Sequence, residues 1–207
     1  MSIRNRRVRR NILWAVAVFS AVFALVPSYV RAYTLSGSSD APTLLLGDRV
    51  WVNLASYDVR FPYTDTVLWA RARPRPGDLV LVRWPGDRHA VFKRVVALAG
   101  DRIGMKGHHL ILNGQPLAYA PSDNSAFASA PPANLLGSVF EVETIGGIEH
   151  LITYTPGTRD SFAEVQVPEG QCFLLGDNRD PSVDSRDRGS VPYHCVRGKI
   201  VSMPARR

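Results

Sequence analysis

The first 31 residues constrain this chain more than any other part of it. No charged residue occurs from Asn11 to Val30, and the part from Ile12 to Val26 is almost wholly apolar. A helix of about twenty residues extends roughly 30 Å, which is the thickness of the hydrocarbon core of a bilayer. The sequence therefore predicts a membrane-spanning anchor over residues 11–31.

The charge on either side of this segment predicts its orientation. Five arginines precede it, namely Arg4, Arg6, Arg7, Arg9 and Arg10. Only Arg31 follows it closely, and positive residues flanking a span favour the cytoplasmic side. We therefore expect a basic cytoplasmic tail over residues 1–10. Residues 32–207 would lie on the outer, periplasmic or extracellular, side of the inner or plasma membrane, in a single-pass protein.

A cleavable secretory signal is the alternative to an anchor. Val30-Arg31-Ala32 fits the small-x-small pattern of a cleavage site. However, the apolar run is long for a signal, and an arginine is unfavourable at the middle position. The pattern thus favours an uncleaved anchor, and both alternatives place the rest of the chain outside the cytoplasm.

The net charge of +7 argues against nucleic-acid binding once it is located. Without the five arginines of the tail, 20 cations remain against 18 acidic residues. A nearly neutral body lacks the basic surface that nucleic acids require, so we expect no nucleic-acid partner. The length of 207 residues allows one main domain with a small insertion.

Beyond the anchor the chain consists of short apolar runs separated by turns, which predicts a mainly β fold. Gly-Asp, a dipeptide typical of turns, occurs five times. Strands are predicted at 49–52, 79–82, 91–97, 102–103, 110–112, 139–142, 150–154, 172–175 and 199–203. Residues 118–133 are rich in Ala, Pro and Ser, so a loop or small insertion is expected around 118–165.

The cysteines and histidines give no metal signature. Cys172 and Cys195 are compatible with a disulfide outside the cytoplasm and equally with two buried thiols. None of the five histidines stands at ligand spacing from another histidine or a cysteine. We therefore predict no metal site and no cofactor.

Three segments carry candidate chemistry, and the first is the serine-rich segment from Leu35 to Leu44. Its composition alone is typical of a flexible linker. However, it continues into Pro42–Val50, which has the character of a rigid turn followed by a strand. This continuation favours a fixed position for its serines.

The second segment is the predicted strand around Lys93. Alternate residues of a strand share a face, so Lys93 lies with Val91 and Val95, whereas Arg94 points the other way. Burial disfavours the charged form of a lysine, and a neutral amine can act as a general base. A lysine whose amine reaches solvent from an edge strand is the alternative. The pattern leaves open whether Lys93 or Arg94 is the buried cation.

The third segment, Gly176–Arg186, combines acidic and amide side chains with two serines and two arginines in eleven residues. A solvated charged loop is one interpretation. The segment directly follows the apolar run Cys172–Leu175, so it begins at the edge of the core. Its composition suits a hydrogen-bonded scaffold that orients other groups.

Together, and in this order behind an anchor, the three segments resemble the type I signal (leader) peptidase family. The serine box is present as Ser39-Asp-Ala-Pro-Thr-Leu44, and the lysine box as Gly77-Asp-Leu-Val80 followed by Lys93-Arg-Val-Val96. The third box, Gly176–Arg186, is nearly complete and is the most specific of the three. The resemblance covers roughly residues 10–202.

The resemblance implies a Ser–Lys dyad on an antiparallel β core. Ser39 would be the nucleophile and Lys93 the general base. Ser182 matches the serine that hydrogen-bonds the lysine amine, and Asp184 and Arg186 match an ion pair that holds the loop. Asp177 and Arg179 would brace the same turn.

The oxyanion would be bound by the backbone N–H of Ser39 together with a neighbouring group at Gly37. Many relatives carry a serine donor at the position of Gly37, so its absence implies the branch that uses backbone groups. An alternative register makes Ser38 the nucleophile and Ser36 the donor. The spacing to Pro42 favours Ser39.

Two further residues depart from the family pattern. Asp40 stands where methionine is usual, which puts a carboxylate near the site and is expected to weaken an apolar rim facing the membrane. Pro181 stands where asparagine is common and is expected to stiffen the loop.

The implied substrates are preproteins with signal peptides, which would add as a strand and place small Ala-x-Ala side chains in pockets. The lipid bilayer is the second implied partner. Leu44–Leu46 and the aromatic residues Trp51, Phe61, Tyr63 and Trp69 would form a surface in contact with lipid, or else belong to the core.

Two other functions remain open from the sequence. One is a dedicated peptidase that matures a pilin or conjugation substrate. The other is an inactive membrane-tethered β-domain that binds peptides, although peptide binding alone gives no reason for Ser182, Asp184 and Arg186 to occur together. A self-cleaving Ser–Lys repressor shares the chemistry, but here an anchor stands where that class has a DNA-binding domain.

Overall fold

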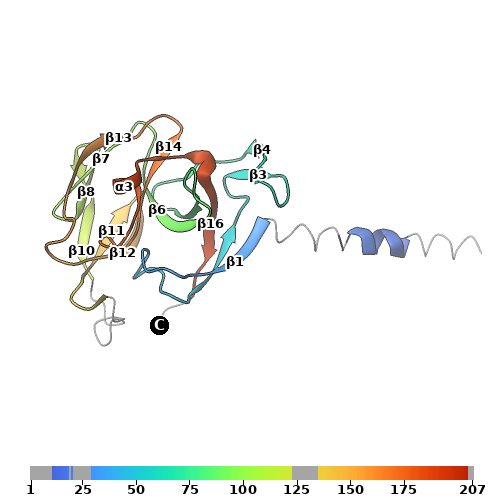
Figure 1. Ribbon diagram of the computed structural model, residues 1–207, viewed down its shortest axis with the longest axis horizontal. Helices are drawn as coiled ribbons and strands as arrows, with labels where there is room; N and C mark the ends of the chain where they lie inside the picture. The colour runs from blue at the N-terminus through green and yellow to red at the C-terminus, as the bar shows by residue number, and fades with distance from the viewer. Residues whose placement is uncertain (1–10, 19, 21–28, 123–134, 205–207) are drawn as a thin grey trace, which may run out of the picture.

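The computed structural model describes residues 11–18, 20, 29–122 and 135–204, and over these residues the folded part is built of antiparallel strands (Figure 1). This confirms the predicted mainly β, antiparallel fold. The main sheet has the order β1-β2-β16-β5-β6-β14-β15. Its strands are β1 Val30–Thr34, β2 Arg49–Asn53, β16 Val196–Ser202, β5 Leu79–Val82, β6 Val91–Leu98, β14 Gln171–Leu175 and β15 Val191–Pro192.

Three smaller sheets complete the structure. The first has the order β10-β11-β12, the second β13-β7-β8-β9, and the third is the β3–β4 hairpin. Their strands are β3 Asp58–Arg60, β4 Val67–Ala70, β7 Arg102–Lys106, β8 His109–Leu112, β9 Gln115–Pro116, β10 Ala118–Pro121, β11 Val139–Ile145, β12 Ile148–Tyr154 and β13 Phe162–Gln166. Helix α3 Ser185–Arg188 and the 3-10 turn η2 Tyr193–Cys195 lie between β14 and β16.

The central strands of the main sheet are buried on both faces, which explains their continuous apolar sequence. All four residues of β5 are buried, and Val80 and Val82 pack into a different cluster from Leu79 and Leu81. A third cluster packs Val96 and its neighbours against β7 and β8. Residues of both faces of β6 are thus removed from water, including its two charged side chains.

Every predicted strand is present, but others were missed. The missed strands are β1, β3, β4, β9, β10, β13 and β15. Strand β4 is exposed along its whole length and β13 is nearly so, so neither shows the alternation of a half-buried strand. Strands β9 and β15 have only two residues each, which is too short for a pattern.

The segment expected to be a loop or small insertion contains regular structure. Strands β10, β11 and β12 form a sheet of their own within it, and β13 pairs with β7. The small insertion is therefore a β-sheet and not an irregular loop. Residues 123–134, most of the Ala- and Pro-rich part, lie outside the described residues.

The predicted anchor is only partly within the described residues. Residues 11–18 are helical, whereas residues 19 and 21–28 and the basic tail over 1–10 lie outside them. None of the helices in the described ranges has the length and apolarity needed to cross a bilayer. Strand β1 begins at Val30, so the last two residues of the predicted segment 11–31 pair with β2 in the main sheet.

Cys172 and Cys195 are both free and buried, so the interpretation as two thiols holds and the disulfide does not. Both belong to the cluster between β5, β6 and β14. Burial raises the pKa of the Cys172 thiol to about 12, and it also raises the pKa of Cys195.

Candidate active site

Ser39 and Lys93, which are 54 residues apart in the chain, meet where the turn after β1 packs against β6. The Lys93 amine Nζ lies 2.7 Å from Ser39 Oγ and donates a hydrogen bond to it. The same amine donates to the backbone oxygen of Phe92 at 2.9 Å. Strand β6 supplies the lysine, and the turn after β1 supplies the serine. This distance allows direct proton transfer between the two groups.

Strand β6 explains how a lysine comes to be buried here. Lys93 pairs with Val80 of β5 and is 2% exposed, and Arg94 on the opposite face is 4% exposed. The sequence left open which of the two cations is buried, and the structure buries both. The two cations differ in their partners: Arg94 bonds the carboxylate of Asp177, whereas the Lys93 amine bonds only neutral oxygen atoms among the described residues.

The two candidate serines differ in their surroundings. The Lys93 amine bonds Ser39, whereas the Ser38 backbone oxygen accepts from the backbone N–H of Ala41 at 3.2 Å and from the Asn178 amide Nδ2 at 3.3 Å. The Ser39 backbone oxygen accepts from the Asn178 N–H at 3.0 Å. Asn178 therefore holds the serine turn by donating hydrogen bonds to the backbone oxygens of Ser38 and Ser39. This geometry favours Ser39 over Ser38 as the nucleophile.

Asp40 does not lie on an exposed rim, contrary to the expectation from the sequence. It is 3% exposed and turned inward, where the Ser39 hydroxyl donates a hydrogen bond to Asp40 Oδ2 at 2.8 Å. Asp40 Oδ1 is buried and has no hydrogen-bond partner within the described part of the chain. The nucleophile is thus contacted by a carboxylate on one side and an amine on the other.

Burial governs the charge state of Asp40. It raises the pKa of the carboxyl to about 7, against the opposing attraction of Lys93, and the nearby Asp177 adds to the rise. Near neutral pH the carboxyl therefore titrates. When ionised, the Asp40 carboxylate holds the Ser39 hydroxyl proton in a hydrogen bond, which opposes transfer of that proton to Lys93. Protonation of the carboxyl weakens this competition.

Gly176 allows the third box to approach the serine turn closely. A Cβ atom at this position would lie 2.3 Å from the Ser39 backbone oxygen and 2.4 Å from Ser182 Oγ. Both distances are far below van der Waals contact, so only glycine fits. The Gly-Asp dipeptides at residues 47, 77, 86 and 100 have a positive φ at glycine, as expected for turns, but Gly176 is required for close approach instead.

Ser182 is fully buried beside Gly176, close to the Ser39 turn. The hydrogen bonds of the Lys93 amine go to Ser39 and Phe92, and Ser182 Oγ makes none of standard geometry within the described residues. Its hydroxyl faces Asp184 and contributes to the lowered pKa of that carboxyl. The structure thus brings Ser182 to the site without the bond to the lysine amine that the resemblance implied.

The ion pair implied for the loop is present. Arg186 donates to both carboxylate oxygens of Asp184, at 2.9 Å and 2.8 Å. Asp184 also caps helix α3 and accepts from the Gly176 N–H at 3.1 Å. The carboxylate therefore ties the end of β14, where the glycine lies, to α3. The pair positions the loop that covers the serine turn, and a catalytic role for it remains a prediction.

A buried ion network lies behind the dyad, and it consists of Arg94, Asp177, His150, Glu143 and Arg179. Arg94 donates two bonds of 2.7 Å to Asp177, and Arg179 donates one of 2.7 Å to Glu143. His150 Nε2 lies 3.1 Å from Glu143 and 3.9 Å from Asp177, so it joins the two pairs. The network holds Asp177 and Arg179 in place, and through them the start of the third box.

Sequence reasoning missed Glu143 and His150. They lie on neighbouring strands, β11 and β12, and face each other in register. Arg179 and His150 lower the pKa of Glu143 against the effect of burial. Neither residue stands in a motif, so alternation along the two strands was the only available signal, and it does not indicate which face is buried.

The proposed oxyanion groups lie at the exposed side of the turn. Gly37 is exposed, with open space where its side chain would be. No hydrogen bond within the described part of the chain uses the Ser39 N–H, so this donor is free to face a substrate oxygen. The geometry is compatible with an oxyanion site at Ser39, and the contribution of Gly37 remains a prediction.

Comparison with known proteins gives a consistent result. A sequence profile described as signal peptidase, peptidase S26, matches residues 8–203. A signal peptidase I of Pseudomonas fluorescens is 32% identical over 181 residues, covering 84% of this chain and 62% of that protein. Signal peptidase I S of Bacillus subtilis is 31% identical over 191 residues, covering 90% of this chain and 85% of that protein.

The chain spans less than two thirds of the length of some of these relatives. The share is 62% for the Pseudomonas fluorescens protein and 59% for that of Pseudomonas aeruginosa, which is 32% identical. A crystal structure of a signal peptidase I from Enterococcus faecalis is 25% identical and matches with a TM-score of 0.40, covering 64% of this chain and all of that one.

Proposed function

Because the chain belongs to the signal peptidase family, peptidase S26, we propose that it is a serine endopeptidase that cleaves signal peptides from exported preproteins. The observation that carries this proposal is the 2.7 Å contact between the amine of a buried lysine and the hydroxyl of Ser39. A lysine amine can remove the proton of a serine only when it is close and uncharged. The 2.7 Å distance meets the first condition, and the Lys93 amine forms no ion pair with a carboxylate among the described residues.

In the first half of the reaction, Ser39 Oγ attacks the carbonyl carbon of the scissile bond while Lys93 takes the hydroxyl proton. The oxyanion that forms is stabilised by the Ser39 N–H, with Gly37 leaving the approach open. Lys93 then gives its proton to the leaving amine as the C–N bond breaks. The product is an ester between Ser39 and the signal peptide.

In the second half, a water molecule loses a proton to Lys93 and attacks the ester carbon. The Ser39 oxygen leaves and recovers the proton from the lysine, so the dyad returns to its starting state. Ser182, Asp184 and Arg186 support both halves by holding the loop that packs on the serine turn. No step requires a metal or a cofactor.

The membrane has a defined place in this proposal. We propose that residues 11–29, up to the start of β1, span the bilayer with the N-terminus in the cytoplasm and the β domain on the outer side. Ser39 follows this segment by only ten residues, so the site would lie near the outer surface, where a signal peptide ends its own span. Small side chains before the cut, of the Ala-x-Ala type, are the expected specificity.

Exposed apolar groups support contact with lipid. Trp51, Phe61, Tyr63 and Trp69 are each between 45% and 70% exposed, so the alternative of core packing does not hold for them. Leu46 is also exposed, whereas Leu44 is fully buried and belongs to the core. Exposed aromatic rings of this kind are typical of the membrane interface.

The test is cleavage of a preprotein by the full chain in detergent. Ser39→Ala should abolish cleavage, and the matched variant Ser38→Ala should retain it, because only Ser39 contacts the lysine amine. Cleavage is measured by the appearance of the mature product. Loss of activity in Ser38→Ala with retention in Ser39→Ala would move the nucleophile to the other register, and retention in both would end the proposal.

The general enzyme is favoured over the two alternatives from the sequence. The relatives are signal peptidases, and the groups of the proposed dyad are in contact, which an inactive peptide-binding domain does not require. A panel of preproteins with unrelated signal peptides separates a general enzyme from a dedicated one. The general enzyme should cleave most of the panel.

A further inference from the structure

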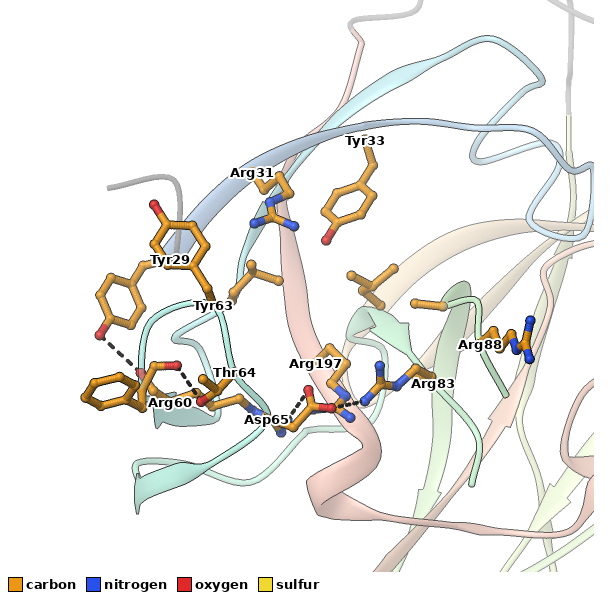
Figure 2. A pocket seen from close by; sticks show the side chains of 14 residues that line it. Tyr29, Arg31, Tyr33, Arg60, Tyr63, Thr64, Asp65, Arg83, Arg88 and Arg197 are labelled. Carbon is orange, nitrogen blue, oxygen red and sulfur yellow. Dashed lines mark hydrogen bonds and ion pairs between the residues drawn. The ribbon is translucent and has the colours of Figure 1, made fainter. Parts of the chain in front are cut away.

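A second site lies at the end of the sheet where β1 begins. A cavity of about 650 Å³ opens between β1, the β3–β4 hairpin and the turn that joins β5 to β6 (Figure 2). Five arginines line it, namely Arg31, Arg60, Arg83, Arg88 and Arg197. The one carboxylate among its lining residues is Asp65. We call this site the arginine pocket.

Three of the arginines are held in place. Asp65 lies between Arg197, at 2.8 Å, and Arg83, as Figure 2 shows, and it is 3.9 Å from Arg60. Arg60 is fixed further by two bonds to Asp58 and one to the backbone oxygen of His194. Arg60 thus has a second carboxylate in Asp58, whereas Arg83 and Arg197 share the single charge of Asp65.

The other two arginines have no ion-pair partner within the described part of the chain. Arg31 and Arg88 are exposed and belong to β1 and the β5–β6 turn, at different sides of the pocket (Figure 2). Guanidinium groups bind planar or tetrahedral anions through pairs of N–H donors. The tyrosines Tyr29, Tyr33 and Tyr63 add aromatic lining. The pocket therefore has the charge and the donors for an anion that the protein itself does not supply.

From this arrangement we propose that the arginine pocket binds the phosphate of an anionic phospholipid headgroup. The inference rests on the proposed function in one respect, because it takes residues 11–29 to span the bilayer. Tyr29 is the last residue of that segment and Arg31 follows it closely, so the pocket would lie at the depth of the headgroups. Basic residues immediately outside a span attract anionic lipids.

The β3–β4 hairpin distinguishes a lipid from a soluble anion. Phe61 is 57% exposed, Leu68 53% and Trp69 60%, and Phe61 itself lines the pocket. An apolar surface beside a cationic pocket matches a lipid, whose headgroup is charged and whose chains are apolar. An acidic peptide segment would satisfy the arginines, but it would leave this apolar surface without a partner.

The test is a binding titration of the full chain in neutral maltoside detergent, followed by its tryptophan fluorescence. The probes are a short-chain phosphatidylglycerol, the matching phosphatidylcholine, inorganic phosphate and a glutamate-rich peptide. Phosphatidylglycerol should bind at least about tenfold more tightly than each of the other three, because two free arginines and an apolar surface act together.

Two double variants each remove two positive charges, one variant inside the arginine pocket and the other outside it. Arg31→Gln with Arg88→Gln should weaken phosphatidylglycerol binding by about tenfold or more. Arg49→Gln with Arg71→Gln removes two exposed arginines outside the pocket and should change it less than about twofold. Asp65→Asn should tighten binding, because it removes the anion that competes for Arg83 and Arg197.

Each other outcome overturns the inference. Equal weakening in the two double variants would mean non-specific attraction. Inorganic phosphate binding as tightly as the lipid would mean a soluble anion, and tighter binding of the acidic peptide would mean a peptide site. Cleavage of a preprotein is measured on the same samples without added lipid. Binding without cleavage would contradict the proposed function alone, and cleavage without binding would contradict this inference alone.

Discussion

The buried ion network and the arginine pocket each contain several arginines, but the positive charges are compensated differently in the two regions. In the network, Arg94 and Arg179 are almost fully buried, and each has a carboxylate of its own at 2.7 Å. In the pocket, three arginines share Asp65, which is 64% exposed, and two have no carboxylate within the described residues. Water can screen the second group but not the first.

The difference indicates what each region can do. A buried cation without a partner costs several kcal/mol, so the network must be complete before the protein is stable, and it can only serve as a scaffold. An exposed cation costs little, so the pocket tolerates an incomplete set of partners and can accept one from outside. Lys93 is the exception in the buried region, because its amine hydrogen-bonds neutral oxygen atoms only among the described residues, and this exception is the proposed general base.

The strongest way to test that exception is to remove the amine. Lys93→Met keeps the length of the side chain and replaces the base with an apolar group. We expect kcat/KM to fall by about 10⁴-fold or more, while the domain remains folded because Lys93 forms no ion pair with a described carboxylate. Preprotein cleavage and thermal unfolding measure the two effects. The control is Lys106→Met, an exposed lysine of β7, which should leave both unchanged.

The next largest effect should come from breaking the buried ion network. Asp177→Asn leaves Arg94 buried without its carboxylate, and we expect the free energy of unfolding to fall by about 3–5 kcal/mol. Chemical denaturation in detergent measures the change. A loss below about 1 kcal/mol would mean that water reaches Arg94, and the contrast between the two regions would then disappear.

Asp40→Asn should reveal a dependence on pH. Because the pKa of Asp40 is raised from 3.8 to about 7, its neutral form is favoured in the folded state, and the wild type loses stability as pH rises from 3.8 through 7. The variant lacks this loss, so it should match the wild type near pH 3.8 and exceed it by up to about 4 kcal/mol above pH 7. Thermal unfolding across this range measures the difference.

The same variant should also change the pH profile of cleavage. In the wild type, an ionised Asp40 above pH 7 holds the Ser39 hydroxyl proton, and the variant has no carboxylate to do so. The ratio of kcat/KM in the variant to that in the wild type should therefore increase as pH rises through 7. An unchanged profile in a folded Asp40→Asn variant would show that the carboxyl does not influence the dyad.

The smallest effect should follow from Asp65→Asn in the arginine pocket. Three ion pairs are lost, but the carboxylate is exposed and screened, so the free energy of unfolding should change by less than about 1 kcal/mol. Measured under the same conditions as Asp177→Asn, it gives the direct contrast between an exposed and a buried pairing. A loss comparable to that of Asp177→Asn would mean that the pocket is structural.

The sequence predicted the fold class from local patterns, and the proposed dyad from short motifs that resemble the signal peptidase family. Lys93 lies in the predicted strand 91–97, and Ser39 stands three residues before Pro42. Both signals survive without knowledge of the rest of the chain. The third box likewise carries its Asp184–Arg186 pair within three residues.

The remainder depends on contacts between distant segments. Glu143 meets Arg179 across 36 residues, and the arginine pocket collects its side chains from β1, the β3–β4 hairpin, the β5–β6 turn and β16. A local sequence pattern does not predict these contacts, because they depend on the order of the strands in the sheets. Asp40 illustrates the same limit, since its position in the chain was noted but the direction of its side chain depends on the packing of β6 and β14 around it.

The two unpaired thiols bear on how the domain can be handled. Cys172 and Cys195 sit among apolar side chains, and burial keeps the Cys172 thiol protonated, with a pKa of about 12. A protonated thiol is a poor nucleophile, so it does not exchange with oxidants or other cysteines. The fold of the β domain consequently does not depend on a disulfide between these two cysteines, and a reductant should leave its thermal unfolding unchanged.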